Sequence, residues 1–486
     1  MLTVTDGYKA AIKARGRAVV AKVNVYFDGE GELPTTFYND SLGRLYFLEE
    51  ARADTSNPLG VCSANEVTIA FRNDDRAFTP TNESSPYYGL LLPNVRVEPY
   101  LGVMVRQEPV PPAEVGELEA EWVALGVFWT SDWSAPSSDL VATVTCYDII
   151  YKLGNLDMPA LPIVPNTTAG ELFEMLCEAI GLTAGEYEVD AALNYPISMG
   201  WLPGGLVKEA FQALILGANC SIVSTRAGKL KAYSNFSLVP SVATWTEHDQ
   251  IINVNLPQRY LDTYSQVGVI YKLPYLEASS TLLQISQLAV PAGGVVLQRM
   301  PFSSGPAGRI RRIELIGAEN VVVSAFQYDA WTITITLTNS GPTEIIDLNV
   351  YGQVVKTVDS EFVVEDAALK AIIGEKKLVI DSYLIQSRDM AVEYATVLLR
   401  LVSNPATRLT MTVRGDPAIE LTDVFTVTNT RNLIGTVEIT PIRFTYDWTG
   451  GLRATCLGIR TDVLELYDWT CVSPGLYIYG RRGVSV

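Results

Sequence analysis

The alternation of apolar and polar residues predicts a chain built mainly from β-strands. In the segment 331–338 four apolar side chains share one face and four threonines share the other, and the turn-forming residues 339–342 follow. This period of two is that of a half-buried strand. The same period recurs at 19–27, 66–72 and 408–413. Strands therefore extend over both the beginning and the end of the chain.

Helical patterns are fewer. Thr168 and Glu171 fit a capping box that opens an amphipathic helix, and Gly181 supplies its end. Apolar residues at helical spacing predict two more helices, one at 206–216 and one that follows Ser387 and ends near 404–405. Many short strands with a few helices between them indicate a mainly β (α+β) fold, with several β-barrel or sandwich domains and a small helix-containing α+β domain.

The loops divide the chain into four predicted parts. Residues 1–155 form a first β domain, which a proline-rich linker separates from an α+β domain with two helices and a hairpin at 156–247. Residues 248–460 form a second β domain with an inserted β subdomain around 290–360. The last segment, 461–486, is a C-terminal extension rich in aromatic residues that packs back on the body or docks onto a neighbouring subunit.

Length and composition support a multidomain globular protein. The chain has 486 residues, of which 48% are hydrophobic and 19% charged, so intrinsic disorder is excluded. The formal net charge of −18 argues against binding to a phosphate backbone. The N-terminal segment lacks the pattern of a signal peptide, and no uncharged apolar run approaches the ~20 residues that span a bilayer. We therefore expect a soluble protein without a membrane-spanning segment.

The residues that carry most enzyme chemistry are scarce. His248 is the one histidine of the chain, so a zinc site with two histidines cannot form. A catalytic triad based on His248 lacks the Gly-x-Ser-x-Gly motif that would accompany it. Six scattered cysteines without a Cys-x-x-Cys pair predict free thiols and neither a disulfide framework nor a metal site; they are Cys62, Cys146, Cys177, Cys220, Cys456 and Cys471.

Other motifs have a simpler structural interpretation. The acidic segments 117–121 and 359–361 could supply the two carboxylates of a glycoside hydrolase, but a chain with 54 acidic residues contains such pairs by chance. Residues 73–75, Asn-Asp-Asp, lack the ligand spacing of a calcium loop, and residues 414–416, Arg-Gly-Asp, follow directly after a strand. We interpret both as turns. No phosphate-binding loop is present, and we predict no catalytic, cofactor-binding or metal-binding residue and no cofactor.

Four segments of the first β domain resemble minor tail proteins of tailed bacteriophages and prophages. They are Asn-Asp-Asp-Arg-Ala-Phe-Thr-Pro at 73–80, Ser-Pro-Tyr-Tyr at 85–88, Leu-Pro-Asn-Val-Arg-Val at 92–97 and Thr-Val-Thr-Cys-Tyr-Asp at 143–148. Asn94 stands where that family usually has glycine, and asparagine also enters left-handed turns. The order of these segments is that of the family's N-terminal domain.

Later segments are similar to the tail-tip (baseplate) hub class within that family. They are the helix at 206–216, the hairpin 220–233 with its reversal at 226–228, the segment 380–385 with the helix after it, and the segment 414–424 that returns to a β-barrel. Thr422 replaces a glycine that is usual there. The matches cover about residues 1–460, apart from 275–345, and because only 26 residues follow we expect a hub without an enzymatic C-terminal domain.

The resemblance implies a non-enzymatic structural hub located in the virion tail and assembled in the host cytoplasm. Such a hub is a homotrimer in which each subunit contributes two tube-like β domains, so that the ring joins a sixfold tail tube to a threefold tip and gives a conduit for DNA. Its partners would be the tail tube and distal tail proteins, the tape measure protein, the tip or fibre proteins, and viral DNA only in transit. Two alternatives remain open from the residues, a receptor-binding protein that stacks host carbohydrate on aromatic side chains and a carboxylate-based cell-wall hydrolase.

Overall fold

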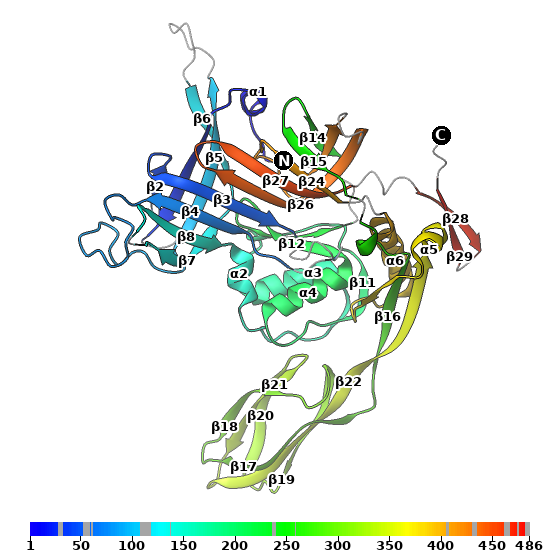
Figure 1. Cartoon of the computed structure of the whole chain (residues 1–486). Helices are drawn as coiled ribbons and strands as arrows, with labels where there is room; N and C mark the ends of the chain where they lie inside the picture. Colours follow the sequence, from blue (N-terminus) through cyan, green and yellow to red (C-terminus); the bar gives the residue numbers. More distant parts are fainter. Residues whose placement is uncertain are drawn as a thin grey trace.

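A computed structural model gives the fold of most of the chain. It describes residues 1–27, 33–51, 59, 62–106, 118–136, 138–235, 240–257, 259–404, 408–429, 435–460, 467–473 and 476–481. A large sheet lies above a small helical layer in Figure 1, and a long two-stranded ribbon leads from the body to a separate β-sandwich. The mainly β fold predicted from the sequence is confirmed.

The large sheet has 14 strands, which come from the first third, the middle and the last fifth of the chain. The first half contains β1 Val19–Tyr26, β2 Thr35–Tyr38, β3 Leu42–Glu50, β4 Glu66–Arg72, β5 Arg96–Arg106, β6 Leu118–Ala124, β7 Phe128–Ser134 and β8 Val141–Tyr147. The second half contains β14 Ser241–Thr246, β15 Ile251–Asn255, β24 Arg408–Val413, β25 Val424–Asn429, β26 Gly435–Trp448 and β27 Leu452–Arg460. The main path runs β15-β24-β27-β26-β3-β4-β8-β7-β5-β1-β2. The two halves meet where β26 pairs with β3.

One hydrophobic core fills both halves of this sheet. Phe47 of β3 stacks on Tyr446 of β26 with 6.0 Å between the ring centroids, and the indole N–H of Trp448 donates to the carbonyl of Val19 at 3.0 Å. Trp245, which is 1% exposed, packs on Phe425. Because apolar contacts and hydrogen bonds cross from one half to the other, the halves share one interior.

A small α+β layer lies under the large sheet. It consists of α2 Ile149–Gly154, α3 Ala169–Ala179, α4 Val207–Ala218 and the strands β9 Val164–Thr168, β10 Tyr187–Val189, β11 Pro196–Gly200, β12 Cys220–Ser224 and β13 Leu230–Ser234. The capping box predicted for α3 is present, since Thr168 accepts from the amide of Glu171 and the Glu171 carboxylate accepts from the amide of Thr168. The helices pack around Leu172, Phe173 and Phe211, which are fully buried.

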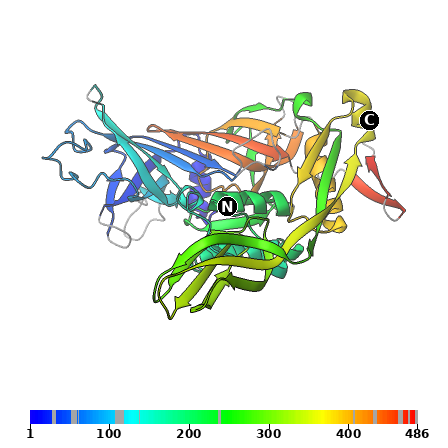
Figure 2. The same ribbon diagram turned by 90° about the horizontal axis from the view of Figure 1, so that it is seen from below.

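The ribbon consists of the paired strands β16 Gln266–Leu276 and β22 Glu344–Glu365. Its inner end packs against α6 Arg388–Ser403, whose N-cap is Ser387, and beside it lie η1 Tyr260–Asp262, α5 Ala367–Ile373 and β23 Lys377–Asp381. Figure 2 shows the ribbon running past the helical layer to the sandwich.

The sandwich packs the outer part of a five-stranded sheet, which also includes the ribbon strand β16 and β23, against a three-stranded sheet. One sheet joins β17 Ser280–Val290 and β19 Ala307–Ile316 to β22, and the other contains β18 Val295–Pro301, β20 Val321–Tyr328 and β21 Thr332–Asn339. Ile333, Ile335 and Leu337 point into its core, as their alternation with threonine predicts. The indole N–H of Trp331 donates to the carbonyl of Leu202 at 2.7 Å, which anchors the sandwich to the helical layer.

The three predicted helices and the predicted strands are confirmed, with small shifts at their ends. The helix predicted at 206–216 continues to Ala218 and ends at Asn219, which has the left-handed φ of 45°. Three short helices escaped the sequence analysis, α2, α5 and α1 Asp6–Lys13. Each spans eight residues or fewer, so its apolar face repeats too few times to form a pattern.

The C-terminal extension contains one antiparallel hairpin, formed by β28 Tyr467–Ser473 and β29 Leu476–Arg481. The side chains of this segment, including Cys471, lie outside the described residues, so its predicted packing stays a prediction. The division of the chain into four domains likewise stays a prediction. Across the described ranges, none of the helices combines the length and the hydrophobicity needed to cross a membrane.

Candidate functional site: the seam between the two sheet halves

The two halves of the large sheet are joined by six paired positions, from Arg443 opposite Glu50 to Trp448 opposite Leu45. Ion pairs flank this pairing on its exposed side. The guanidinium of Arg44 donates twice to the carboxylate of Asp447, at 2.8 Å for each bond, and Arg443 pairs with Glu50. We call this junction of β3 and β26, with the buried polar groups beneath it, the seam.

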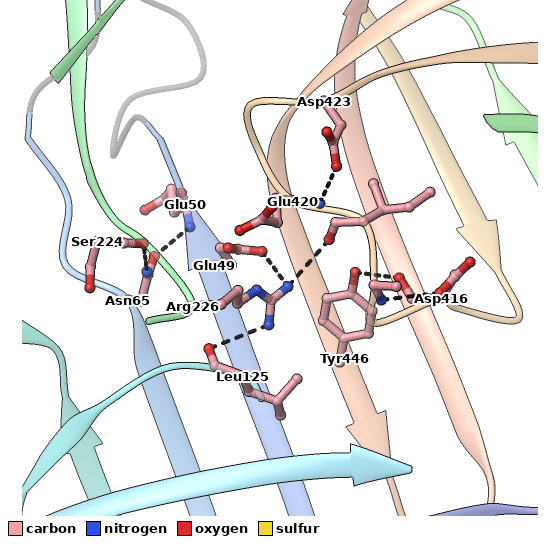
Figure 3. Close-up of polar contacts among 12 residues, drawn as sticks. Glu49, Glu50, Asn65, Leu125, Ser224, Arg226, Asp416, Glu420, Asp423 and Tyr446 are labelled. Carbon is pink, nitrogen blue, oxygen red and sulfur yellow. Dashed lines mark hydrogen bonds and ion pairs between the residues drawn. The ribbon is translucent and has the colours of Figure 1, made fainter. Parts of the chain in front are cut away.

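Arg226 enters the seam from below (Figure 3). Its guanidinium donates to the carboxylate of Glu49 at 2.8 Å and to the carbonyls of Leu125 at 3.3 Å and Ile419 at 3.4 Å. The same group lies 4.8 Å from the ring centroid of Phe47. Glu49, Leu125 and Phe47 belong to the first half of the chain and Ile419 to the second, so one side chain of the helical layer contacts both halves.

The hairpin β12–β13 places Arg226 in this position. Its turn is closed by hydrogen bonds between Thr225 and Lys229 and from the amide of Gly228 to the carbonyl of Thr225. Gly228 has φ of 77°, and a Cβ atom there would lie 2.7 Å from Val127, so the turn can approach the first half of the sheet only with glycine. The reversal predicted at 226–228 is confirmed.

Burial controls the charge of the acidic groups around Arg226. Glu49 is 3% exposed, and this desolvation raises its pKa to about 7, although the positive charge of Arg226 lowers the pKa in part. The neighbouring carboxylates of Glu420 and Asp423 add to the increase. Asp148 is 1% exposed, and burial raises its pKa to about 7 against the effect of its backbone hydrogen bonds.

Asn65 connects this cluster to the helical layer. Its side-chain oxygen accepts a hydrogen bond from the backbone amide of Glu50 at 3.0 Å, and its backbone amide donates to the carboxylate of Asp148 at 2.9 Å. Asp148 also caps α2 by accepting from the amide of Ile150. The side-chain amide of Asn65 donates to the carbonyl of Ser224 in β12. These bonds hold β3, α2 and the Arg226 hairpin in one arrangement.

The Arg-Gly-Asp segment forms the other side of the seam, and it is a turn as predicted. Gly415 has φ of 92°, and the carboxylate of Asp416, 6% exposed, accepts from the hydroxyl of Tyr8 at 3.2 Å and from the amide of Ala418 at 3.1 Å. Tyr446 of β26 donates to the carbonyl of Asp416. Burial raises the pKa of the Asp416 carboxyl, and the burial also withdraws this tripeptide from recognition by another protein.

Two arginines clamp α1 onto this turn. Arg17 donates to the carbonyls of Ile12, Gly415 and Leu452 at 3.2, 2.7 and 3.2 Å, and also to that of Arg414. Arg414 in turn donates to the carbonyls of residues 13–15, at the C-terminal end of α1. A cation at the C-terminus of a helix satisfies its last carbonyls and opposes its dipole.

The geometry of the seam suits a joint better than a catalytic centre. Its carboxylates are buried and engaged by arginine, tyrosine and backbone groups, so a substrate could not contact them without displacing those partners. The acidic segments considered as hydrolase candidates do not meet there. Asp359 and Glu361 lie on the ribbon, where they pair with Lys272 and Lys377, and Glu121 binds the backbone amide of Thr5. Glu117 lies outside the described residues.

The surroundings of the remaining sequence motifs indicate structural roles for them. His248 lies in the turn between β14 and β15 with a side chain that is 79% exposed. Asn73 is buried and organises its turn by accepting from the amide of Phe78 at 2.9 Å and donating to Thr79 at 3.0 Å. Five cysteines are free thiols, as predicted, and burial raises their pKa values; they are Cys62, Cys146, Cys177, Cys220 and Cys456.

Sequence reasoning missed Arg226, Glu49 and the contact of Arg17 with Arg414. The hairpin turn was predicted, but an arginine in a tight turn is normally solvent-exposed, and nothing in the local pattern of residues 225–229 marks it as buried. Its burial results from the sheet that folds over the turn, whose residues are distant in sequence.

The raised pKa values predict that acid stabilises the seam. A carboxyl with a pKa near 7 in the folded state and 4.5 or 3.8 when unfolded binds its proton more tightly in the folded protein. The stability it contributes is full below about pH 4 and is lost as pH rises through about 7. We expect the urea midpoint to fall from pH 5 to pH 7, and Glu49→Gln to reduce that fall. Glu174→Gln, on the exposed face of α3, is the matched control; equal slopes in both variants would contradict the prediction.

No family model and no curated protein matches this sequence. The fold, in contrast, has relatives among solved structures. The tail protein from Neisseria meningitidis MC58 is similar with a TM-score of 0.50 and 11% sequence identity, over 92% of this chain and 98% of that one. The 43 kDa tail protein of prophage MuSo2 from Shewanella oneidensis has a TM-score of 0.49 and 11% identity, over 92% of this chain and 100% of that one.

The likeness extends over nearly the whole length of both chains. The molecule has the fold of the Neisseria tail protein, and the resemblance to tail proteins predicted from the sequence is confirmed at the level of the fold.

Proposed function

We propose that this protein is a structural hub of a bacteriophage tail tip or baseplate, in which three copies form a ring between the sixfold tail tube and the threefold tip. The observation that carries the proposal is the large sheet, in which two groups of strands from opposite ends of one chain pair side by side. Three such chains supply six β units around one axis, which fits a sixfold tube on one side and a threefold tip on the other.

The free ends of the sheet support this assembly. The main path of the sheet ends at β15 in the second half and at β2 in the first half. In Figure 1, β2 lies at the left of the large sheet and β14–β15 lie to the right of the first-half strands. Unpaired sheet edges invite pairing with another chain, and head-to-tail contacts close into a ring when the rotation between neighbours is 120°. The β3–β26 seam is the junction that such a ring would repeat between subunits.

Charge supports a conduit for DNA. The chain carries a formal net charge of −18, so three copies bring three times that charge to the ring. A negatively charged channel repels the phosphate backbone and lets DNA slide without adhering. The partners proposed from the resemblance follow from this role. They are the tail tube and distal tail proteins, the tape measure protein and the tip or fibre proteins, in a virion tail assembled in the host cytoplasm.

The burial of the seam carboxylates supports a non-enzymatic role. A glycosidase needs one protonated and one ionised carboxyl on either side of a sugar bond. Glu49 and Asp148 have suitably raised pKa values, but both are nearly inaccessible and both hold backbone or arginine groups in place. Incubation with peptidoglycan should therefore release no muropeptides, and their release would contradict the proposal.

The ring is tested by measuring mass in solution together with electron microscopy. Ile252 is 57% exposed on β15, one end of the sheet, and Ile372 is 74% exposed on α5. Ile252→Lys should weaken the trimer at least tenfold, because a lysine on an edge strand opposes strand pairing, whereas Ile372→Lys should not. A wild-type protein that stays monomeric and binds purified host glycan would overturn the hub and favour the receptor-binding alternative.

A further inference from the structure

Lys22 lies on the outer face of the first-half sheet between two aromatic rings. Its ammonium nitrogen is 4.6 Å from the ring centroid of Tyr100 and 4.7 Å from that of Trp122. Tyr38 of β2 stands directly opposite Lys22 in the sheet register and is 52% exposed, with its ring 6.4 Å from that of Trp122. We call Lys22, Tyr38, Tyr100 and Trp122 the Lys22 cradle. It lies beside β2, the edge strand at one end of the main path of the large sheet.

A glycine makes the cradle possible. Gly102 is the sheet partner of Trp122, and a Cβ atom at position 102 would lie 2.7 Å from the indole ring. The Trp122 ring therefore lies flat over the backbone of β5 instead of standing away from the sheet, which brings it within reach of Lys22. The rings are fixed by the sheet before any partner binds.

The neighbouring carboxylate is already engaged. Glu98 accepts from the hydroxyls of Tyr26 and Tyr100, both at 3.0 Å, and from Arg96 at 2.6 Å. Among the described residues, no carboxylate forms an ion pair with Lys22, and burial lowers the pKa of its ammonium group. Within the described part of the chain, this cation lies near two aromatic rings and has no ion-pair partner.

The seam inside the chain contains the same arrangement in a completed form. There Arg44 of the first half lies 5.4 Å from the ring centroid of Tyr46, and the second half supplies the carboxylate of Asp447, which binds Arg44 at 2.8 Å. Beside β2 the cation and the rings are present, but the nearby carboxylate of Glu98 is bound to Tyr26, Tyr100 and Arg96. The difference between the two places is the presence of a second sheet half.

We propose that the Lys22 cradle receives an aspartate or glutamate from the second sheet half of a neighbouring copy of this chain. The inference rests on the proposed ring and specifies a contact that closes it. Charge complementarity argues for this occupant, since an acidic copy meets a cation whose desolvation is already partly complete. The two nearby rings also restrict the position of the ammonium group, so a carboxylate meets a preorganised partner.

The test compares substitutions of Lys22 by the dissociation constant of the trimer in analytical ultracentrifugation. Lys22→Gln should weaken the trimer at least tenfold, Lys22→Glu should weaken it further through like-charge repulsion, and Lys22→Arg should stay within threefold of the wild type. Lys208→Gln, on the exposed side of α4, is the matched control and should leave the constant unchanged. Raising the salt concentration should weaken the wild-type trimer more than the Lys22→Gln trimer.

The outcomes separate this inference from the proposed function. A wild-type chain that is monomeric at all concentrations overturns the ring and the contact together. A wild-type trimer whose dissociation constant is unaffected by Lys22→Gln and Lys22→Glu overturns the contact alone. Variants that trimerise normally but lose retention on a polygalacturonate column would show an acidic-glycan site instead, and this too overturns the inference. Unchanged urea midpoints establish that each variant is folded.

Discussion

Replacing Arg226 by methionine should lower the free energy of unfolding by about 3–5 kcal/mol, the range for breaking a buried ion pair by removing one partner. The guanidinium is 3% exposed and is bound to Glu49 and to the carbonyls of Leu125 and Ile419. Without it the Glu49 carboxyl stays buried without a counter-charge, and two backbone acceptors lose a donor. Urea denaturation followed by tryptophan fluorescence measures the change.

A second substitution separates the ion pair from the packing. The double variant Arg226→Met with Glu49→Leu removes both charges and should recover a large part of the loss, because apolar replacement of a whole buried pair is often neutral or stabilising. Arg311→Met is the control, since Arg311 is exposed on β19 and should change the free energy by no more than about 0.5 kcal/mol. If Arg226→Met behaves like Arg311→Met, Arg226 does not hold the seam together.

Replacing Arg17 by methionine should cost about 2–3 kcal/mol and should release α1 from the seam. Arg17 donates to four backbone carbonyls, those of Ile12, Arg414, Gly415 and Leu452. Hydrogen bonds from a charged group contribute about 1.5–3 kcal/mol each, and partial exposure lets water replace some of them. Hydrogen exchange of the amides in residues 6–13 should therefore accelerate more than exchange in β24 and β27.

The local readout distinguishes a clamp from a general loss of stability. Arg17→Lys keeps the charge but lacks the planar fork, so it should give an intermediate exchange rate at 6–13. A uniform acceleration over the whole large sheet would show that Arg17 supports the core as a whole, and an unchanged rate at 6–13 would show that Tyr8, Ile12 and Arg414 hold α1 without Arg17.

The predictions for Arg226 and Arg17 both concern how firmly the two halves of the large sheet are held together. A ring that transmits load between a tube and a tip needs its two β units to move as one body within each subunit. The seam provides this through strand pairing, a shared core and buried polar groups that connect β3, β26 and the hairpin turn at Arg226. Buried charges that lose their partners are strongly unfavourable, so the arrangement resists sliding or opening at the junction.

Much of the secondary structure follows from local sequence. The alternation in 331–338 and the capping box at Thr168 each depend on residues that are neighbours along the chain, so their pattern is visible before folding. The same holds for the turns at 73–75 and 414–416, where the side chains of Asn73 and Asp416 accept hydrogen bonds from nearby backbone amides. The resemblance to tail proteins also depended on short segments of this kind.

The seam could not be predicted in the same way. Arg226 and Glu49 are 177 residues apart, and Tyr8 and Asp416 are 408 residues apart. Periodicity describes which face of an element is apolar but not which distant element covers it. The helix α1 shows the same limit, because its two buried residues, Tyr8 and Ile12, acquire their environment from strands at both ends of the chain.

The sequence by itself determined a mainly β chain with three well-marked helices, no metal-binding histidine pair and an acidic surface charge. Each of these depends on composition or on contacts within a few residues. Only the tertiary structure decided that strands from opposite ends of the chain share one sheet, and that an arginine in a tight turn is buried between them. Pairing between distant strands and the burial of a charge are set by the whole fold, because desolvation depends on every segment that covers the group.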